Sequence, residues 1–159
     1  MLPTRIFRRL KESLEEHELK TYGRHILVEF FGCDEAILDN VSRVEEVMRA
    51  AVKASGATEV GCVFHKFQPQ GTSGVIVLSE SHISIHTWPG DGYASVDFYT
   101  CGDCDPHAGV DILLEGFNGA SYELLFVERG QEGKKTSMSV ADHTTRQAFS
   151  PSLMAGGAE

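Results

Sequence analysis

The stretch His82-Ile83-Ser84-Ile85-His86-Thr87-Trp88 alternates strictly between two kinds of side chain. The first kind is apolar or β-branched and comprises Ile83, Ile85 and Thr87. The second kind carries imidazole, hydroxyl and indole groups. A period of two is typical of a β-strand, whose successive side chains point to opposite faces of the sheet. We therefore expect a strand with one face packed on helices and a second face that is unusually rich in functional groups.

Further strands are predicted on both sides of this one, because runs rich in β-branched and aromatic residues recur along the chain. They cover residues 24–31, 58–67, 74–79, 93–100 and 121–128. Helices are predicted over 34–55, with Asp34 as N-cap and Gly56 as the C-terminal stop, and over 106–117. The predicted fold class is α+β, a two-layer sandwich of a largely antiparallel sheet with two helices on one face. The other face would need a partner subunit or a ligand to cover it.

The chain of 159 residues is long enough for one domain with extensions. We expect an N-terminal extension at 1–21, helical in character, a domain at 22–129 and a flexible, polar C-terminal tail at 130–159. A net charge of −9 makes the chain a poor nucleic-acid binder, because it would repel phosphates. No apolar run approaches the roughly 20 residues of a membrane helix, so we expect no membrane partner.

Four cysteines are too few for a small disulfide scaffold, and no secretory signal precedes them. We expect reduced thiols and a cytoplasmic location. His82 and His86 could suggest zinc, but four residues along a strand separate them by about 13 Å, too far to share one ion. Cys101 and Cys104 could form a redox pair, although the aspartates around them disfavour thiolate. No metal is expected.

The junction Ser79-Glu80-Ser81-His82 lies between two good strands without a glycine or proline to make a turn. It is either a tight polar corner or a place where chemistry happens on the backbone. The residues alone leave both interpretations open.

The run from Leu78 to Pro89, Leu-Ser-Glu-Ser-His-Ile-Ser-Ile-His-Thr-Trp-Pro, closely resembles the self-processing segment of the S-adenosylmethionine decarboxylases of the short prokaryotic type. Other blocks resemble the same family in the same order: Gly23-Arg24-His25, Phe64-His65-Lys66-Phe67, Gly71-Thr72-Ser73-Gly74 and Tyr99-Thr100-Cys101-Gly102. The resemblance covers roughly residues 22–129.

The resemblance implies that the hydroxyl of Ser81 attacks the carbonyl of Glu80, and that the resulting ester undergoes β-elimination to a dehydroalanine. Hydrolysis of the dehydroalanine would then leave a covalent pyruvoyl group derived from Ser81. The chain would split into residues 1–80 and 81–159. A ketone supplies the electrophile that no natural side chain offers, since it can hold a substrate amine as an imine and accept the electrons released with CO₂. The resemblance thus implies a decarboxylase of a small-molecule amine without pyridoxal phosphate.

The resemblance also assigns roles to individual residues. His86 would be the processing base, taking the α-proton of Ser81 during the elimination. Cys101 would be the proton donor after decarboxylation, and Ser73 would support processing. Phe67 and Trp88 would sandwich the adenine of the substrate, with plain core packing as the alternative for each. Members of the family are dimers of the cleaved pair, which implies a homodimer here.

One position departs from the family pattern. The familiar members carry Glu after the Trp-Pro pair, where its carboxylate binds the ribose hydroxyls, and this chain has Gly90. Asp91 could take over that role. Otherwise the substrate could be a smaller amine such as ornithine or arginine, or the chain could be an unprocessed, inactive homologue. The leading interpretation is decarboxylation of S-adenosylmethionine for spermidine synthesis.

Overall fold

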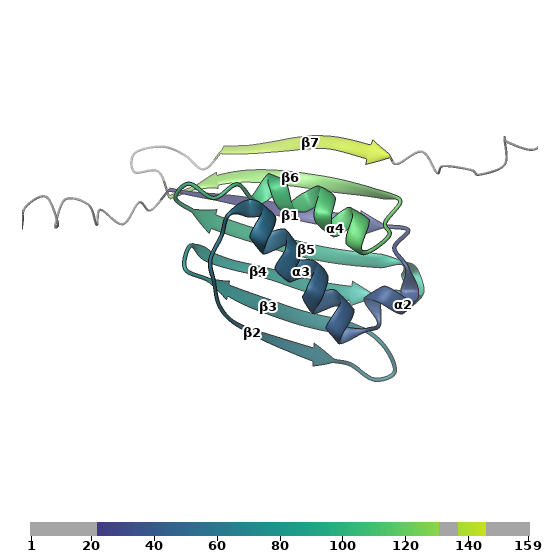
Figure 1. Cartoon of the computed structure of the whole chain (residues 1–159). Helices are drawn as coiled ribbons and strands as arrows, with labels where there is room; N and C mark the ends of the chain where they lie inside the picture. The colour runs from purple at the N-terminus through teal and green to yellow at the C-terminus, as the bar shows by residue number, and fades with distance from the viewer. Residues whose placement is uncertain (1–21, 131–136, 146–159) are drawn as a thin grey trace, which may run out of the picture.

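Seven strands form one sheet in the order β2-β3-β4-β5-β1-β6-β7, and every neighbouring pair is antiparallel (Figure 1). The computed structural model describes residues 22–130 and 137–145. The strands are β1 (Gly23–Phe31), β2 (Glu59–Lys66), β3 (Thr72–Leu78), β4 (Ser81–Trp88), β5 (Tyr93–Cys101), β6 (Ser121–Arg129) and β7 (Ser137–Thr145).

The helices lie on one face of this sheet (Figure 1). They are α2 (Glu35–Leu38), α3 (Val41–Ser55) and α4 (Val110–Gly116), and two 3₁₀ turns are η1 (Pro89–Asp91) and η2 (Pro106–Gly109). The predicted fold class, an antiparallel sheet with helices on one face, is confirmed. No helix in the described ranges is long and apolar enough to cross a membrane.

The first predicted helix is interrupted, which the sequence pattern did not indicate. Asp34 does cap a helix, since its side chain accepts from the N–H of Ile37, but α2 ends after a single turn. Asn40 then has extended backbone angles, and its side chain accepts from the N–H of Arg43 to start α3. A second N-cap inside the apolar pattern therefore divides one predicted helix into two.

The alternating side chains of β4 point to two different environments, as predicted. Ile83 and Ile85 have no exposed surface and Thr87 retains 7%, so this side of the strand packs in the core beneath the helices. The core also contains Phe30, Phe98 and Phe117. We use the term open face for the opposite side of the sheet. On it, β4 and β5 carry four cross-strand pairs: His82 with Tyr99, Ser84 with Asp97, His86 with Ser95 and Trp88 with Tyr93.

The expectation of a flexible tail from residue 130 is wrong for part of that segment. Residues 137–145 form β7, which pairs with β6 at the edge of the sheet. An edge strand offers a row of unpaired backbone groups, so a following segment gains hydrogen bonds by adding to it. The remainder of the predicted tail and the predicted N-terminal extension lie outside the described residues.

Candidate active site

The β3–β4 hairpin turns in two residues, Ser79 and Glu80, at the predicted junction. Its position is fixed by Thr58, just before β2. The N–H of Ser79 donates to the Thr58 carbonyl at 2.9 Å, and the N–H of Thr58 donates to the Glu80 carboxylate at 2.9 Å. The side chain of Glu80 therefore anchors the turn, a contact that no sequence pattern predicts.

The carbonyl oxygen of Glu80 accepts two hydrogen bonds from Cys101. The backbone N–H of Cys101 lies 3.1 Å from this oxygen, and its thiol sulfur lies 3.0 Å away. Two donors on one carbonyl oxygen polarise the carbonyl and stabilise the negative charge that develops there when a nucleophile adds to the carbon. The structure thus brings Cys101 to the Glu80–Ser81 peptide bond.

The segment after Cys101 is held by Arg24, at the start of β1. Its guanidinium donates to the carbonyl of Gly102 at 3.0 Å and to that of Cys104. Arg24 belongs to one of the blocks that resemble the family, but the sequence did not indicate what it does. In the structure Arg24 fixes the loop that follows Cys101.

The hydroxyl of Ser81 has a base beside it. Its Oγ lies 3.1 Å from Nδ1 of His82, the next residue along β4. The sequence pattern placed His82 on the polar face but assigned it no role in chemistry. The contact could not be foreseen, because neighbouring residues of a regular strand point to opposite faces and meet here only where the strand begins.

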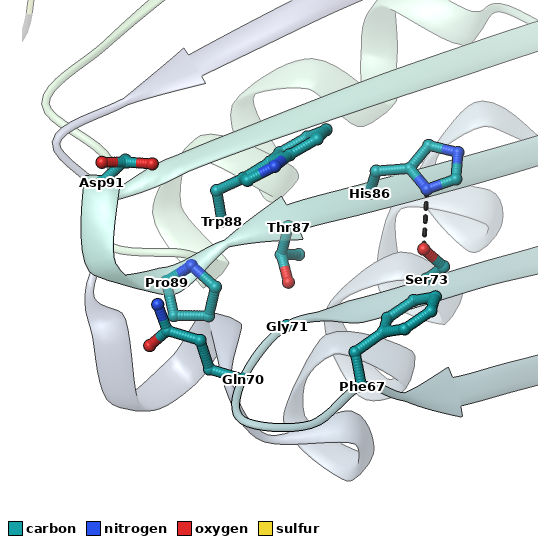
Figure 2. Close-up of a pocket in the computed structure, with 9 residues that line it drawn as sticks. All are labelled: Phe67, Gln70, Gly71, Ser73, His86, Thr87, Trp88, Pro89 and Asp91. Atoms are coloured by element: carbon teal, nitrogen blue, oxygen red, sulfur yellow. Dashed lines mark hydrogen bonds between the residues drawn. The ribbon is translucent and has the colours of Figure 1, made fainter.

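A pocket of about 290 Å³ lies on the open face near the other end of β4. It gathers five of the predicted site residues, namely Phe67, Ser73, His86, Trp88 and Asp91. Figure 2 shows His86 and Trp88 projecting from the same side of β4, with Ser73 of the neighbouring strand facing His86.

The pocket residues have the properties of a binding site rather than of a core. Ser73 Oγ and His86 Nδ1 are 2.6 Å apart, so the hydroxyl orients the imidazole. Phe67 and Trp88 are each 46% exposed. Their exposure argues against the alternative of plain core packing. Phe67 contacts His65 and Trp88 contacts Tyr93, but part of each ring remains accessible to a ligand.

The region around Gly90 contains a residue that the sequence did not single out. A Cβ added at Gly90 would lie 2.8 Å from Nε2 of Gln70, so the Gln70 amide occupies the space that a larger residue at position 90 would need. Gln70 and Asp91 both line the pocket (Figure 2). Two polar side chains are thus available where the family glutamate is absent.

The predicted catalytic residues fall into two groups within one chain. Ser81 and Cys101 meet at the Glu80–Ser81 peptide bond, whereas Ser73 and His86 meet at the pocket. Five residues along β4 separate Ser81 from His86, a distance of about 16 Å at about 3.3 Å per residue. His86 therefore cannot reach Ser81 of its own chain in this arrangement. The expected role of His86 as processing base cannot be performed within a single chain.

The remaining cysteines do not resemble a redox centre. Burial raises the pKa of Cys33 to about 11. Burial also raises the pKa of Cys104, and the nearby Glu80 carboxylate adds to this effect. A raised pKa suppresses the thiolate on which disulfide exchange depends. Within the part of the chain that the structure describes, no three or more His, Cys, Asp or Glu side chains are grouped to hold a metal ion.

Comparison with known proteins identifies relatives of one kind. The family model described as S-adenosylmethionine decarboxylase matches residues 24–130. The S-adenosylmethionine decarboxylase proenzyme of Thermotoga maritima is 46% identical over 114 residues, covering 71% of this chain and 88% of the relative. That of Thermosipho africanus is 53% identical over 98 residues, covering 61% and 75%.

A solved structure agrees with these matches. The crystal structure of the adenosylmethionine decarboxylase from Aquifex aeolicus superposes with a TM-score of 0.64 at 38% sequence identity, covering 73% of this chain and 98% of that one. The family model spans more than half of the chain, and the β3–β4 hairpin, Cys101 and the pocket all lie within it. The chain belongs to the S-adenosylmethionine decarboxylase family.

Proposed function

We propose that this chain is a self-processing, pyruvoyl-dependent decarboxylase that converts S-adenosylmethionine to its decarboxylated form, the aminopropyl donor for spermidine synthesis. The observation that carries the proposal is the pair of hydrogen bonds from Cys101 to the Glu80 carbonyl, next to the Ser81 hydroxyl. The relatives are named S-adenosylmethionine decarboxylase proenzymes, so nothing favours the ornithine or arginine alternative.

In the first step the Ser81 hydroxyl adds to the Glu80 carbonyl carbon. The oxygen that becomes negative is the one already bound by the N–H and the thiol of Cys101. Breaking the peptide C–N bond leaves an ester between Glu80 and Ser81. Loss of the Cα proton of Ser81 then expels the Glu80 carboxylate, and the chain becomes two pieces, 1–80 and 81–159. Water then hydrolyses the dehydroalanine left at residue 81, which releases ammonia and leaves the ketone.

The residues present suit a pyruvoyl group at position 81. The Cys101 sulfur lies 3.0 Å from the Glu80 carbonyl oxygen, so it is at hand where the new terminus forms. When present, the ketone would bind the substrate amine and take up the electron pair released with CO₂. Cys101 would hold the proton for the carbon that loses CO₂. The proposal requires neither a metal ion nor pyridoxal phosphate.

We further propose that the enzyme is a homodimer of cleaved pairs whose open faces meet. Ser73 and His86 lie about 16 Å along the sheet from Ser81 of the same chain. A second copy placed on the open face can supply its Ser73–His86 pair to this Ser81. The open face also exposes the apolar side chains of Val63 and Val77, which are 69% and 47% exposed and which a second copy would cover.

The pocket supports a substrate with an aromatic base and a positive charge. Phe67 and Trp88 offer ring faces for stacking, and Asp91 and Gln70 offer polar groups for a diol. The sulfonium cation of S-adenosylmethionine suits a chain of net charge −9. The cytoplasmic location expected from the sequence stays a prediction.

Intact mass spectrometry of the purified chain, followed by release of ¹⁴CO₂ from carboxyl-labelled substrates, tests the proposal. We expect two fragments divided between Glu80 and Ser81, and CO₂ from S-adenosylmethionine but not from ornithine or arginine. A single uncut chain without activity would identify the inactive homologue instead. If cleaved protein releases CO₂ only from ornithine or arginine, the proposed self-processing is supported and the proposed substrate is contradicted.

Complementation between two variants tests the dimer. Chains carrying Ser81→Ala and chains carrying His86→Ala should each be inactive alone. When they are expressed together, a mixed dimer has one site with Ser81 and His86 both intact, so part of the processing should return. Absence of any return, with mixed dimers demonstrated by differential tagging, would contradict a site shared between two copies.

A further inference from the structure

We infer that His82 is the base that takes the hydroxyl proton of Ser81 when self-cleavage begins. The inference rests on the self-processing proposed above and adds a residue to its first step. A serine hydroxyl is a weak nucleophile at neutral pH, and it is activated when an adjacent base accepts its proton as the new bond forms. The proposed chemistry assigns a base to the later elimination but none to this attack.

The geometry singles out His82 for this task. Its Nδ1 lies 3.1 Å from Ser81 Oγ, within the distance required for proton transfer. The other contacts at the scissile bond come from Cys101, which donates to the carbonyl and so cannot also serve as the acceptor there. His86 is committed to Ser73 and lies about 13 Å along the strand from His82.

The surroundings of His82 hold its ring in place. On the open face, its ring centroid lies 6.5 Å from that of His25 and 6.1 Å from that of Tyr99, both in edge-on contact. His25 lies on β1 and Tyr99 lies on β5. Both strands are on the opposite side of β4 from β3 in the sheet. The hydroxyl can donate to Nδ1 when the ring proton of neutral His82 is on Nε2.

The step balances without any co-reactant. The proton of Ser81 Oγ moves to Nδ1 of His82 as the bond from Oγ to the Glu80 carbon forms. The bond from that carbon to the Ser81 nitrogen then breaks, and the nitrogen takes the proton back from Nδ1. The product is the ester, and His82 returns to its neutral form. His82 and His86 thus serve separate steps, the first on an oxygen-bound proton and the second on a carbon-bound one.

The two steps can be separated because hydroxylamine cleaves an ester but spares a peptide bond. We propose to follow the full-length chain after cell-free synthesis, by gel and intact mass, with and without hydroxylamine. The test variant is His82→Asn, whose amide can accept a hydrogen bond but cannot take a proton. His107→Asn is the matched control, since His107 lies in η2 and its ring contacts Phe126.

For His82→Asn we expect cleavage to slow by about 100-fold or more, the usual effect of losing a general base, with no hydroxylamine-sensitive ester accumulating. His86→Ala should instead accumulate the ester, and His107→Asn should cleave at the wild-type rate. Circular dichroism verifies that each variant is folded. If His82→Asn fails to fold, His82→Gln carries the same test.

Two results would overturn the inference. One is cleavage of folded His82→Asn or His82→Gln at the wild-type rate. The other is slow cleavage with accumulated ester, which would place the block after the attack. Failure of the wild-type chain to cleave at all would be a different result, because it would contradict the proposed self-processing itself.

Discussion

Cys101 contacts the carbonyl oxygen of Glu80 with two of its groups, the thiol at 3.0 Å and the backbone N–H at 3.1 Å. One residue of β5 therefore binds the oxygen on which charge would develop during the proposed cleavage. Only one of the two donors belongs to the side chain, so the two stages of the proposed reaction should depend on Cys101 to different degrees.

Replacing Cys101 with Ala should slow cleavage only about tenfold, because the backbone donor remains and a thiol is a weak hydrogen-bond donor. Release of CO₂ should fall far more, since the proton for the product carbon is lost. A time course of the cleavage and a ¹⁴CO₂ assay on the cleaved fraction measure the two effects. Cys62→Ala is the control, as Cys62 lies on β2, away from the scissile bond. If Cys101→Ala reduced the rate of cleavage and the rate of CO₂ release by the same factor, the different dependence of the two stages on the thiol would be contradicted.

Asp91→Asn should raise KM for S-adenosylmethionine about tenfold with little change in kcat, if Asp91 binds the ribose in place of the missing glutamate. A hydrogen bond to a charged group contributes about 1.5–3 kcal/mol, and its neutral substitute retains part of this. Steady-state kinetics measure the change, with Asp111→Asn in α4 as the control. If Gln70→Ala raises KM and Asp91→Asn does not, the ribose contact belongs to Gln70.

The four thiols should react with iodoacetamide in two classes. Because the pKa of Cys33 is about 11, only about one molecule in a thousand carries its thiolate at pH 8. Burial makes Cys104 slow as well, whereas Cys62 and Cys101 are partly exposed. Mass mapping of labelled peptides, with a urea-unfolded sample as reference, distinguishes the classes.

A Cys104 variant tests the alternative that Cys101 and Cys104 form a redox pair. Cys104→Ala should leave CO₂ release unchanged. Rapid labelling of Cys104, together with loss of activity in this variant, would support the redox pair over the loop thiol.

Acid should destabilise the fold in part through His25. Burial is the largest cause that lowers its pKa, with Arg129 and His82 acting in the same direction and Asp97 opposing them. Because the unfolded chain then binds the proton more readily, the free energy of unfolding falls as pH drops through about 6.5, the ordinary pKa of histidine, and levels off below the folded pKa.

Urea unfolding from pH 8 to 5 measures this effect, in the uncut Ser81→Ala chain so that one molecule is followed. His25→Asn should flatten the dependence relative to the parent, whereas His107→Asn should retain it. Tyr99 and Arg129 also contact His25, so a substitution there changes stability by removing these contacts. The free energy of unfolding of each variant is therefore first compared with that of the parent at pH 8. An unchanged slope in His25→Asn would assign the acid sensitivity to other groups.

The period of the side chains was sufficient to predict the sheet, both faces of β4 and the helical layer, because those features follow from local alternation. The break between α2 and α3 was missed because Asn40 lies within a continuous helical apolar pattern. Its extended backbone and the hydrogen bond from the N–H of Arg43 to its side chain make it an N-cap in the structure. The segment of β7 has a weak apolar pattern, and it is a strand because the edge of β6 offers it hydrogen bonds.

The site was predicted as a set of residues but not as an arrangement. Spacing along β4 already placed His86 far from Ser81, yet the family resemblance grouped them, and the structure shows that they occupy separate places in one chain. His82, Arg24 and Gln70 gain their contacts from segments distant in sequence or from the way a strand begins. Such contacts leave no periodic signal.

The order of strands has a consequence for the cleaved molecule. With the proposed cleavage after Glu80, residues 1–80 would contribute β1, β2 and β3, and β1 lies between β5 and β6 of the second piece. The two pieces are therefore interleaved, and separating them means breaking three strand pairings. Cleavage in the two-residue turn would break no strand pairing, but it would change the molecularity of folding. The precursor folds as one chain, whereas a processed molecule that unfolds must find its other half again by diffusion, at a rate set by concentration.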